Sequence, residues 1–196
     1  MIENEEVIKY FNARSENWNN EIVINDKKIN KILDNAHVSE NMKILDVACG
    51  TGVLIPYYLE RNVQSVLGVD ISPGMIEIAR RSFNDSRISF YVGDAEKSPI
   101  ESDYDGIVIY NAFPHFKDGE RIIQYLSEHL KDGGYLTVAH GMSREQTDAH
   151  HKGSAKHISN GLMEIDELSK IFSKYLTVTT SISDSEIYQI VGVKIR

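Results

Sequence analysis

Acidic and glycine residues stand at the ends of three apolar stretches, where they could bind a nucleotide-like ligand. Asp46, Gly50 and Gly52 follow one stretch, Asp70 ends a second, and Asp94 follows a third. Glycine lets the backbone turn sharply and lets a ligand come close, and the start of a helix offers unpaired N–H groups. A carboxylate can accept both hydroxyls of a ribose. The spacing therefore indicates a site for a ligand that carries a ribose.

The segments around these residues alternate between predicted strands and predicted helices. Runs rich in branched apolar residues predict strands, and apolar residues at helical spacing predict helices. Strands are expected at 44–47, 63–70, 87–92, 104–110 and 135–139, and helices at 53–59, 74–83, 122–130 and 162–172. The sequence Asp132-Gly133-Gly134 is expected to end the third of these helices. Two further runs, 175–182 and 186–195, predict an antiparallel hairpin.

Residues 3–36 are predicted to be helical in two amphipathic segments, marked by Val7, Ile8, Phe11 and Trp18 and by Ile29, Ile32, Leu33 and Ala36. We expect residues 1–40 to form a helical cap that belongs to the same domain as residues 41–196. Neither an internal repeat nor a linker suggests a second domain. Parallel strands place their carboxyl ends at one edge of the sheet, so the three acidic residues should meet there.

The motif Leu45–Gly52 resembles the first motif of class I S-adenosylmethionine-dependent methyltransferases. It differs in having Ala48 where a glycine often stands. The resemblance covers nearly the whole chain and is to the small-molecule type found in ubiquinone and menaquinone biosynthesis. It implies an α/β fold: a Rossmann-like, seven-stranded, mostly parallel sheet with helices on both faces and a C-terminal antiparallel hairpin.

The resemblance also implies a cofactor, S-adenosyl-L-methionine, which would leave as S-adenosyl-L-homocysteine. The glycine loop would take its methionine part, Asp70 its ribose, and Asp94 with Ala95 its adenine. The cofactor-binding residues expected on this basis are Asp46, Ala48, Gly50, Gly52, Asp70, Ile71, Met75, Asp94, Ala95 and Asn111.

Each acidic residue also has a purely structural interpretation. Asp46 could hold the N–H groups of its own loop or face a cationic ligand, because a buried carboxylate is costly without a partner. Asp70 could cap the turn before the next helix, and Asp94 could cap a loop. The third glycine of the dinucleotide pattern is missing, since position 55 is Ile, which weakens a pyrophosphate-binding interpretation.

Substrate contacts are expected from the N-terminal segment and from the loops after the fourth and fifth strands. The candidates are Tyr10, Trp18, Phe113, Arg144 and His150. Trp18 could equally be a core residue, and Arg144 could simply pair with Asp148 one helical turn away. If the acceptor must lose a proton, His140 is the first candidate for the base and His115 the second.

The segment 140–157 holds four of the seven histidines. Histidine nitrogens that converge could bind a metal, but neighbouring His150 and His151 point about 100° apart on a helix. At most one of them could join His140, and we expect no metal site. His151 and His157 are expected to be solvated.

Two other functions remain open beside methyl transfer to a small molecule. A protein could keep the cofactor pocket without transferring a methyl group, and a nicotinamide-dependent oxidoreductase would also place an acid such as Asp70 on a ribose. Asp94 and the terminal hairpin argue against the oxidoreductase. Methyl transfer is an in-line displacement from a sulfonium, so alignment and exclusion of water can supply much of the rate.

Composition limits the cellular setting and the partners. The chain has 196 residues, a net charge of -8 and one cysteine, so an internal disulfide is impossible. The acidic balance argues against a large nucleic-acid interface, and apolar runs are too short to span a membrane. We expect a cytoplasmic monomer or homodimer that acts on a small molecule without nucleic-acid or membrane partners.

Overall fold

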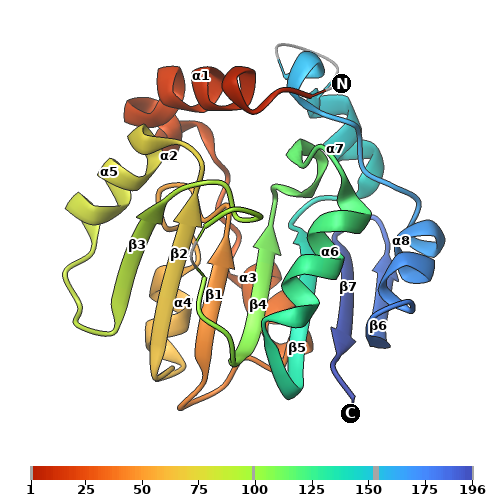
Figure 1. Cartoon of the computed structure of the whole chain (residues 1–196). Coiled ribbons are helices and arrows are strands. Elements are labelled where there is room, and N and C mark those ends of the chain that lie inside the picture. Colours follow the sequence, from red (N-terminus) through yellow and green to blue (C-terminus); the bar gives the residue numbers. More distant parts are fainter. Residues whose placement is uncertain (1, 99, 152–154, 196) are drawn as a thin grey trace.

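The computed structural model describes residues 2–98, 100–151 and 155–195, and the strands of this part form a seven-stranded sheet in the order β3-β2-β1-β4-β5-β7-β6 (Figure 1). Neighbours from β3 to β5 pair in parallel, and β7 is antiparallel to both β5 and β6. The strands are β1 (Lys43–Val47), β2 (Ser65–Asp70), β3 (Ile88–Val92), β4 (Tyr104–Tyr110), β5 (Leu130–His140), β6 (Thr177–Ser183) and β7 (Tyr188–Val193). The predicted fold class, with its C-terminal hairpin, is confirmed.

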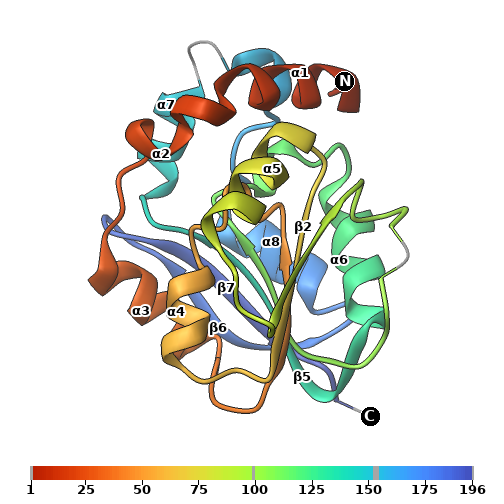
Figure 2. The same ribbon diagram turned by 90° about the vertical axis from the view of Figure 1, so that its left-hand side faces the viewer.

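Helices cover both faces of the sheet, with α3 and α4 on one side and α6 and α8 on the other (Figure 2). The longer helices are α1 (Asn4–Arg14), α3 (Asp26–Asn35), α4 (Ile55–Glu60), α5 (Pro73–Ser82), α6 (Gly119–Glu128), α7 (Arg144–His151) and α8 (Ile165–Phe172). The short ones are η1 (Ser15–Asn17), α2 (Trp18–Glu21), η2 (Phe113–His115) and η3 (Lys156–Ile158). None of the described helices is long and apolar enough to cross a membrane.

Two apolar clusters fix the helices to the sheet. One lies under α6 and α8 and includes Ile107, Ile122 and Phe172; the other lies under α3 and α4 and includes Leu33 and Tyr58. All five side chains are fully buried. Burying an aliphatic or aromatic side chain stabilises a fold by about 1.5–3 kcal/mol. The sheet is thus a rigid platform for the loops at its carboxyl edge.

The first helices lie across that carboxyl edge (Figure 1). Asn12 of α1 binds the start of α5, where its Oδ1 accepts from Ser72 Oγ at 2.7 Å and from the backbone N–H of Gly74 at 2.9 Å. Ser72 also caps α5 by accepting from Met75 N–H. Helices α1 and α2 therefore form a roof over the ends of the strands.

The predicted helical stretch 3–36 consists of two segments, and residues 22–25 separate them; Asn25 caps α3 by accepting from Lys28 N–H. The predicted end of the helix at 122–130 was wrong. The helix before the fifth strand ends at Glu128 rather than at the glycine pair, and β5 begins at once with Leu130, which pairs with Tyr104. The early pairing buries Leu130, which favours the strand over another helical turn. Gly133, at φ +80°, lies in the irregular part of β5 that follows.

Candidate active site

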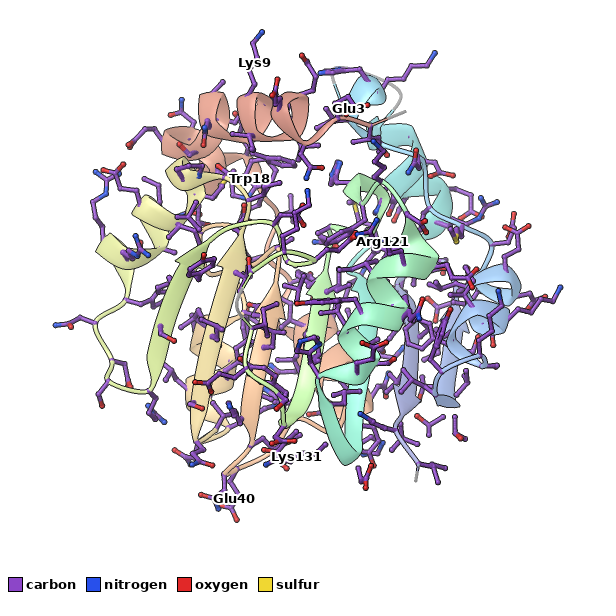
Figure 3. All side chains as sticks on the ribbon, in the orientation of Figure 1. Glu3, Lys9, Trp18, Glu40, Arg121 and Lys131 are labelled. Atoms are coloured by element: carbon purple, nitrogen blue, oxygen red, sulfur yellow. The ribbon has the colours of Figure 1, made fainter. Side chains whose placement is uncertain are left out.

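A cavity of about 360 Å³ lies at the carboxyl edge of the sheet, beneath the roof. Figure 3 shows Trp18 between the roof and the strand ends, and Arg121 at the same edge, at the start of α6. Nine residues of the expected cofactor set line the cavity: Asp46, Ala48, Gly50, Asp70, Ile71, Met75, Asp94, Ala95 and Asn111. They come from β1, β2, the loops after β1 to β4 and the start of α5, so the parallel topology brings together residues far apart in the sequence.

The glycine loop turns through left-handed backbone conformations. Ala48, Gly50 and Gly52 have φ of 56°, 57° and 88°. This left-handed conformation costs alanine about 1 kcal/mol more than it would cost glycine. A side chain at Gly50 would lie 3.9 Å from the Trp18 indole nitrogen. Gly52 does not line the cavity; a Cβ there would come within 2.6 Å of the Phe83 ring, so this glycine serves packing.

Asp70 closes the loop and also faces the cavity. Its Oδ2 accepts from Gly50 N–H and its Oδ1 from Ser72 N–H, both at 2.8 Å. Burial raises the pKa of Asp70 to about 6, and these two hydrogen bonds lower it in part. The carboxylate therefore has the structural role considered from the sequence, and it also lies on the cavity wall.

Asp46 is a buried acidic residue at the end of β1. Its side chain is 2% exposed, and within the described residues its Oδ2 has no hydrogen-bond partner. Burial raises the pKa of Asp46 well above its ordinary value, and the nearby charge of Asp70 raises it further. The loop N–H of Gly50 goes to Asp70 instead. Of the two sequence interpretations, the geometry favours a carboxylate that receives a cationic ligand.

Asp94 joins the loop after β3 to the roof. Its Oδ2 accepts from the Asn4 side-chain amide at 2.9 Å, and its Oδ1 from Glu96 N–H at 3.0 Å. Lys97 lies 3.2 Å from the same carboxylate. Asp94 thus caps its loop and fastens α1 over the cavity that it lines.

Aromatic rings line the roof side of the cavity. Phe11 packs edge-on against Trp18 at 5.4 Å and against His115 at 5.2 Å, and all three line the cavity. Tyr10 also contacts Phe11, but it does not line the cavity, and Arg14 lies over its ring instead. His115 Nδ1 is 2.8 Å from the carbonyl of Ile158. Because a carbonyl only accepts, Nδ1 carries the proton of this contact.

The end of β4 contributes Tyr110 and Asn111. Asn111 has a left-handed backbone, with φ of 54°, and its Oδ1 accepts from Gly141 N–H at 3.0 Å. Burial raises the pKa of Tyr110, against a smaller lowering by a hydrogen bond from the Asn111 side chain. Both residues line the cavity, so a polar pair stands at this strand end.

Several predicted site residues lie elsewhere. His140 is 1% exposed and packs against Tyr188, and Phe113 is 3% exposed in the core under α6. Arg144 binds Glu164, Asp148 and the carbonyl of Leu162, so the structural interpretation of this arginine holds. The His150 side chain lies outside the described residues, and no group of three His, Cys, Asp or Glu within the described part could hold a metal ion.

Some lining residues were missed from the sequence. Asn4, Val7, Lys117 and Arg121 line the cavity, as does the segment 22–24. The sequence did contain a signal for this segment: three consecutive branched apolar residues between Glu21 and Asn25 fit neither flanking helix. No spacing in the sequence indicates that Asn4 reaches Asp94.

Comparisons with known proteins show which sequences and structures this chain is similar to. Residues 44–134 match a family described as a methyltransferase domain. A malonyl-[acyl-carrier protein] O-methyltransferase of Acetivibrio thermocellus is 32% identical over 142 residues, which are 71% of this chain and 50% of that protein. The ubiquinone/menaquinone biosynthesis C-methyltransferase UbiE of Campylobacter jejuni is 27% identical over 56% of this chain and 49% of its own length. The chain thus spans about half the length of these relatives.

Solved structures show the same fold. A Haloferax volcanii methyltransferase, solved in a complex with the Trm112 methyltransferase activator, superimposes with a TM-score of 0.78 at 20% identity, and the match covers 96% of both chains. The match to the methyltransferase domain includes the glycine loop, Asp70 and Asp94. This chain therefore resembles methyltransferases in the sequence of residues 44–134 and shares the fold of solved S-adenosylmethionine-dependent methyltransferases.

Proposed function

We propose that this chain transfers a methyl group from S-adenosylmethionine to a small-molecule acceptor. One observation carries the proposal: Asp46, Asp70, Asp94 and Asn111, from four strand ends, line a single cavity. The roof over this cavity favours a small acceptor over a macromolecule.

The residues present fit a cationic donor. The Oδ2 of Asp46, which has no hydrogen-bond partner among the described residues, would accept from the ammonium group or face the sulfonium. The ligand's charge would restore the ionised form of this buried acid. Asp70 would accept the ribose hydroxyls with lone pairs that its two backbone donors leave. Asp94 would accept from the adenine amino group, with Ala95 and Met75 against the ring and ribose.

When bound, the donor supplies an activated methyl group. The chain's own part is to fix the donor at three carboxylates, to exclude water with the roof, and to hold the acceptor in line. If the acceptor loses a proton, His115 is the first residue to test, because it lines the cavity and His140 does not.

Calorimetry and turnover test this proposal. S-adenosylhomocysteine should bind with a 1:1 stoichiometry, NAD should not bind, and labelled methyl groups should pass from the donor to at least one member of a metabolite panel. Binding of NAD alone would reject the methyl-donor pocket. Binding of S-adenosylhomocysteine without transfer across a broad panel would favour a protein that only retains the ligand.

A further inference from the structure

The cavity reaches both faces of the sheet, and its two ends differ in chemistry. Ala95 and Ala112 belong to the core under α6 and α8, whereas Ile29 and Leu54 belong to the core under α3 and α4; all four line the cavity. We call the second region the apolar end, and it consists of Ile22, Val23, Ile24, Ile29, Val53 and Leu54. Tyr110 packs against the same core and lines the cavity beside it.

The apolar end carries exposed aliphatic side chains. Val23 is 92% exposed and Ile24 is 53% exposed, and both lie on the linker between α2 and α3. Single exposed aliphatic residues are common, but two in sequence that also line a cavity are a better indication of a ligand. A bound apolar group would remove both side chains from water, which favours binding.

The charged residues of the cavity favour an uncharged ligand at this end. The lining cations Lys97, Lys117 and Arg121 come from the loop after β3 and from the region of α6, and they pair with Asp94, Glu3 and Glu96. Among the described residues that line the cavity, these three are the only lysines and arginines. The Lys28 ammonium, near this linker, donates to the carbonyls of Gly141 and Glu186. A carboxylate placed there would lose its hydration without gaining a cation.

We propose that the apolar end binds the methyl acceptor, and that the acceptor is an uncharged molecule with an apolar body. Its reacting group would lie at Tyr110 and Asn111, the polar pair that borders this end. The inference rests on the proposed function, because that function places the donor along Asp94, Asp70 and the glycine loop and leaves the apolar end for the acceptor. It gives the linker 22–24 the role of a specificity segment.

A matched pair of probes tests the inference by calorimetry. The complex with saturating S-adenosylhomocysteine is titrated with 1-naphthol, which is neutral at pH 7, and with 1-naphthoate, which has the same rings and a negative charge. We expect 1-naphthol to bind at least tenfold more tightly. The double variant Val23→Ser/Ile24→Ser should bind 1-naphthol at least tenfold more weakly and S-adenosylhomocysteine within twofold of the unmodified protein. Ile195→Ser is the control, since Ile195 is 65% exposed and does not line the cavity.

The outcomes separate this inference from the proposed function. Equal or tighter binding of 1-naphthoate, or an unchanged affinity of the double variant for 1-naphthol, overturns the inference and leaves the donor site intact. The inference also fails if 1-naphthol does not bind the S-adenosylhomocysteine complex. If S-adenosylhomocysteine does not bind but 1-naphthol shows the expected pattern with the free protein, the donor site is rejected and the apolar end stands as a ligand site.

Discussion

Asp70 and His140 occupy corresponding places, each at the last residue of a parallel strand, β2 and β5. Both are buried, at 8% and 1% exposure. Yet Asp70 lines the cavity and His140 does not. The difference lies in what covers each strand end: Asp70 lies beside the glycine loop, whereas His140 lies beside β7, against Tyr188. A polar residue at a carboxyl strand end thus becomes a site residue only where the next loop leaves space over it.

The largest effect expected from this contrast is the loss of donor affinity in Asp70→Asn. An amide keeps the shape but loses the charge and one acceptor, so the affinity for S-adenosylhomocysteine should fall about 100-fold, since hydrogen bonds to charged groups contribute about 1.5–3 kcal/mol. Isothermal titration calorimetry measures this. The matched variant His140→Asn should stay within twofold in affinity while losing about 1–3 kcal/mol of stability. An equal loss of affinity in His140→Asn would break the contrast.

The same carboxylate predicts a pH dependence of binding. Below its pKa of about 6, Asp70 is protonated in the free protein and cannot accept both hydroxyls of a ribose. Binding to the ionised form therefore strengthens as pH rises through 6, and affinity at pH 5 should be about tenfold weaker than at pH 7. Asp46, whose pKa is also raised by burial, acts in the same direction. Calorimetry on Asp70→Asn isolates the Asp70 part, because that variant should show a flatter profile.

A smaller effect is expected at the link between the roof and the cavity. Asn4 donates to the Asp94 oxygen that we assign to the adenine amino group. Asn4→Ala removes a competing donor worth about 0.5–1 kcal/mol, so S-adenosylhomocysteine should bind about two- to fivefold more tightly. A weaker affinity in this variant would show instead that the amide contacts the ligand or holds the roof in its binding position.

The smallest change in affinity is expected in the segment after β5. Arg144→Ala breaks contacts with Asp148, Glu164 and the carbonyl of Leu162, and it should cost about 1 kcal/mol of stability because these groups are partly exposed. Donor affinity should not change. Chemical denaturation and calorimetry on the same variant check both statements, and a tenfold loss of affinity would place Arg144 in the site after all.

The sequence was enough to predict the sheet, its terminal hairpin and the convergence of residues from separate strands, because each depends on local apolar patterns and on the geometry of parallel strands. It was not enough to separate Asp70 from His140, because coverage by β7 is a long-range property. Nor did it show that Gly52 accommodates the Phe83 ring, or that Ile22 to Ile24 form a cavity wall. Those facts depend on which helix packs where, and no residue spacing encodes that.

The single cysteine offers a practical consequence. Cys49 lies in the glycine loop and on the cavity wall, yet it is only 6% exposed, and burial raises the pKa of its thiol. A thiol held in this way reacts with an alkylating reagent only when the loop opens. The chain therefore carries its own reporter at the donor site: the rate of alkylation measures how often the loop opens, and a ligand that occupies the loop should slow that rate without any engineered label.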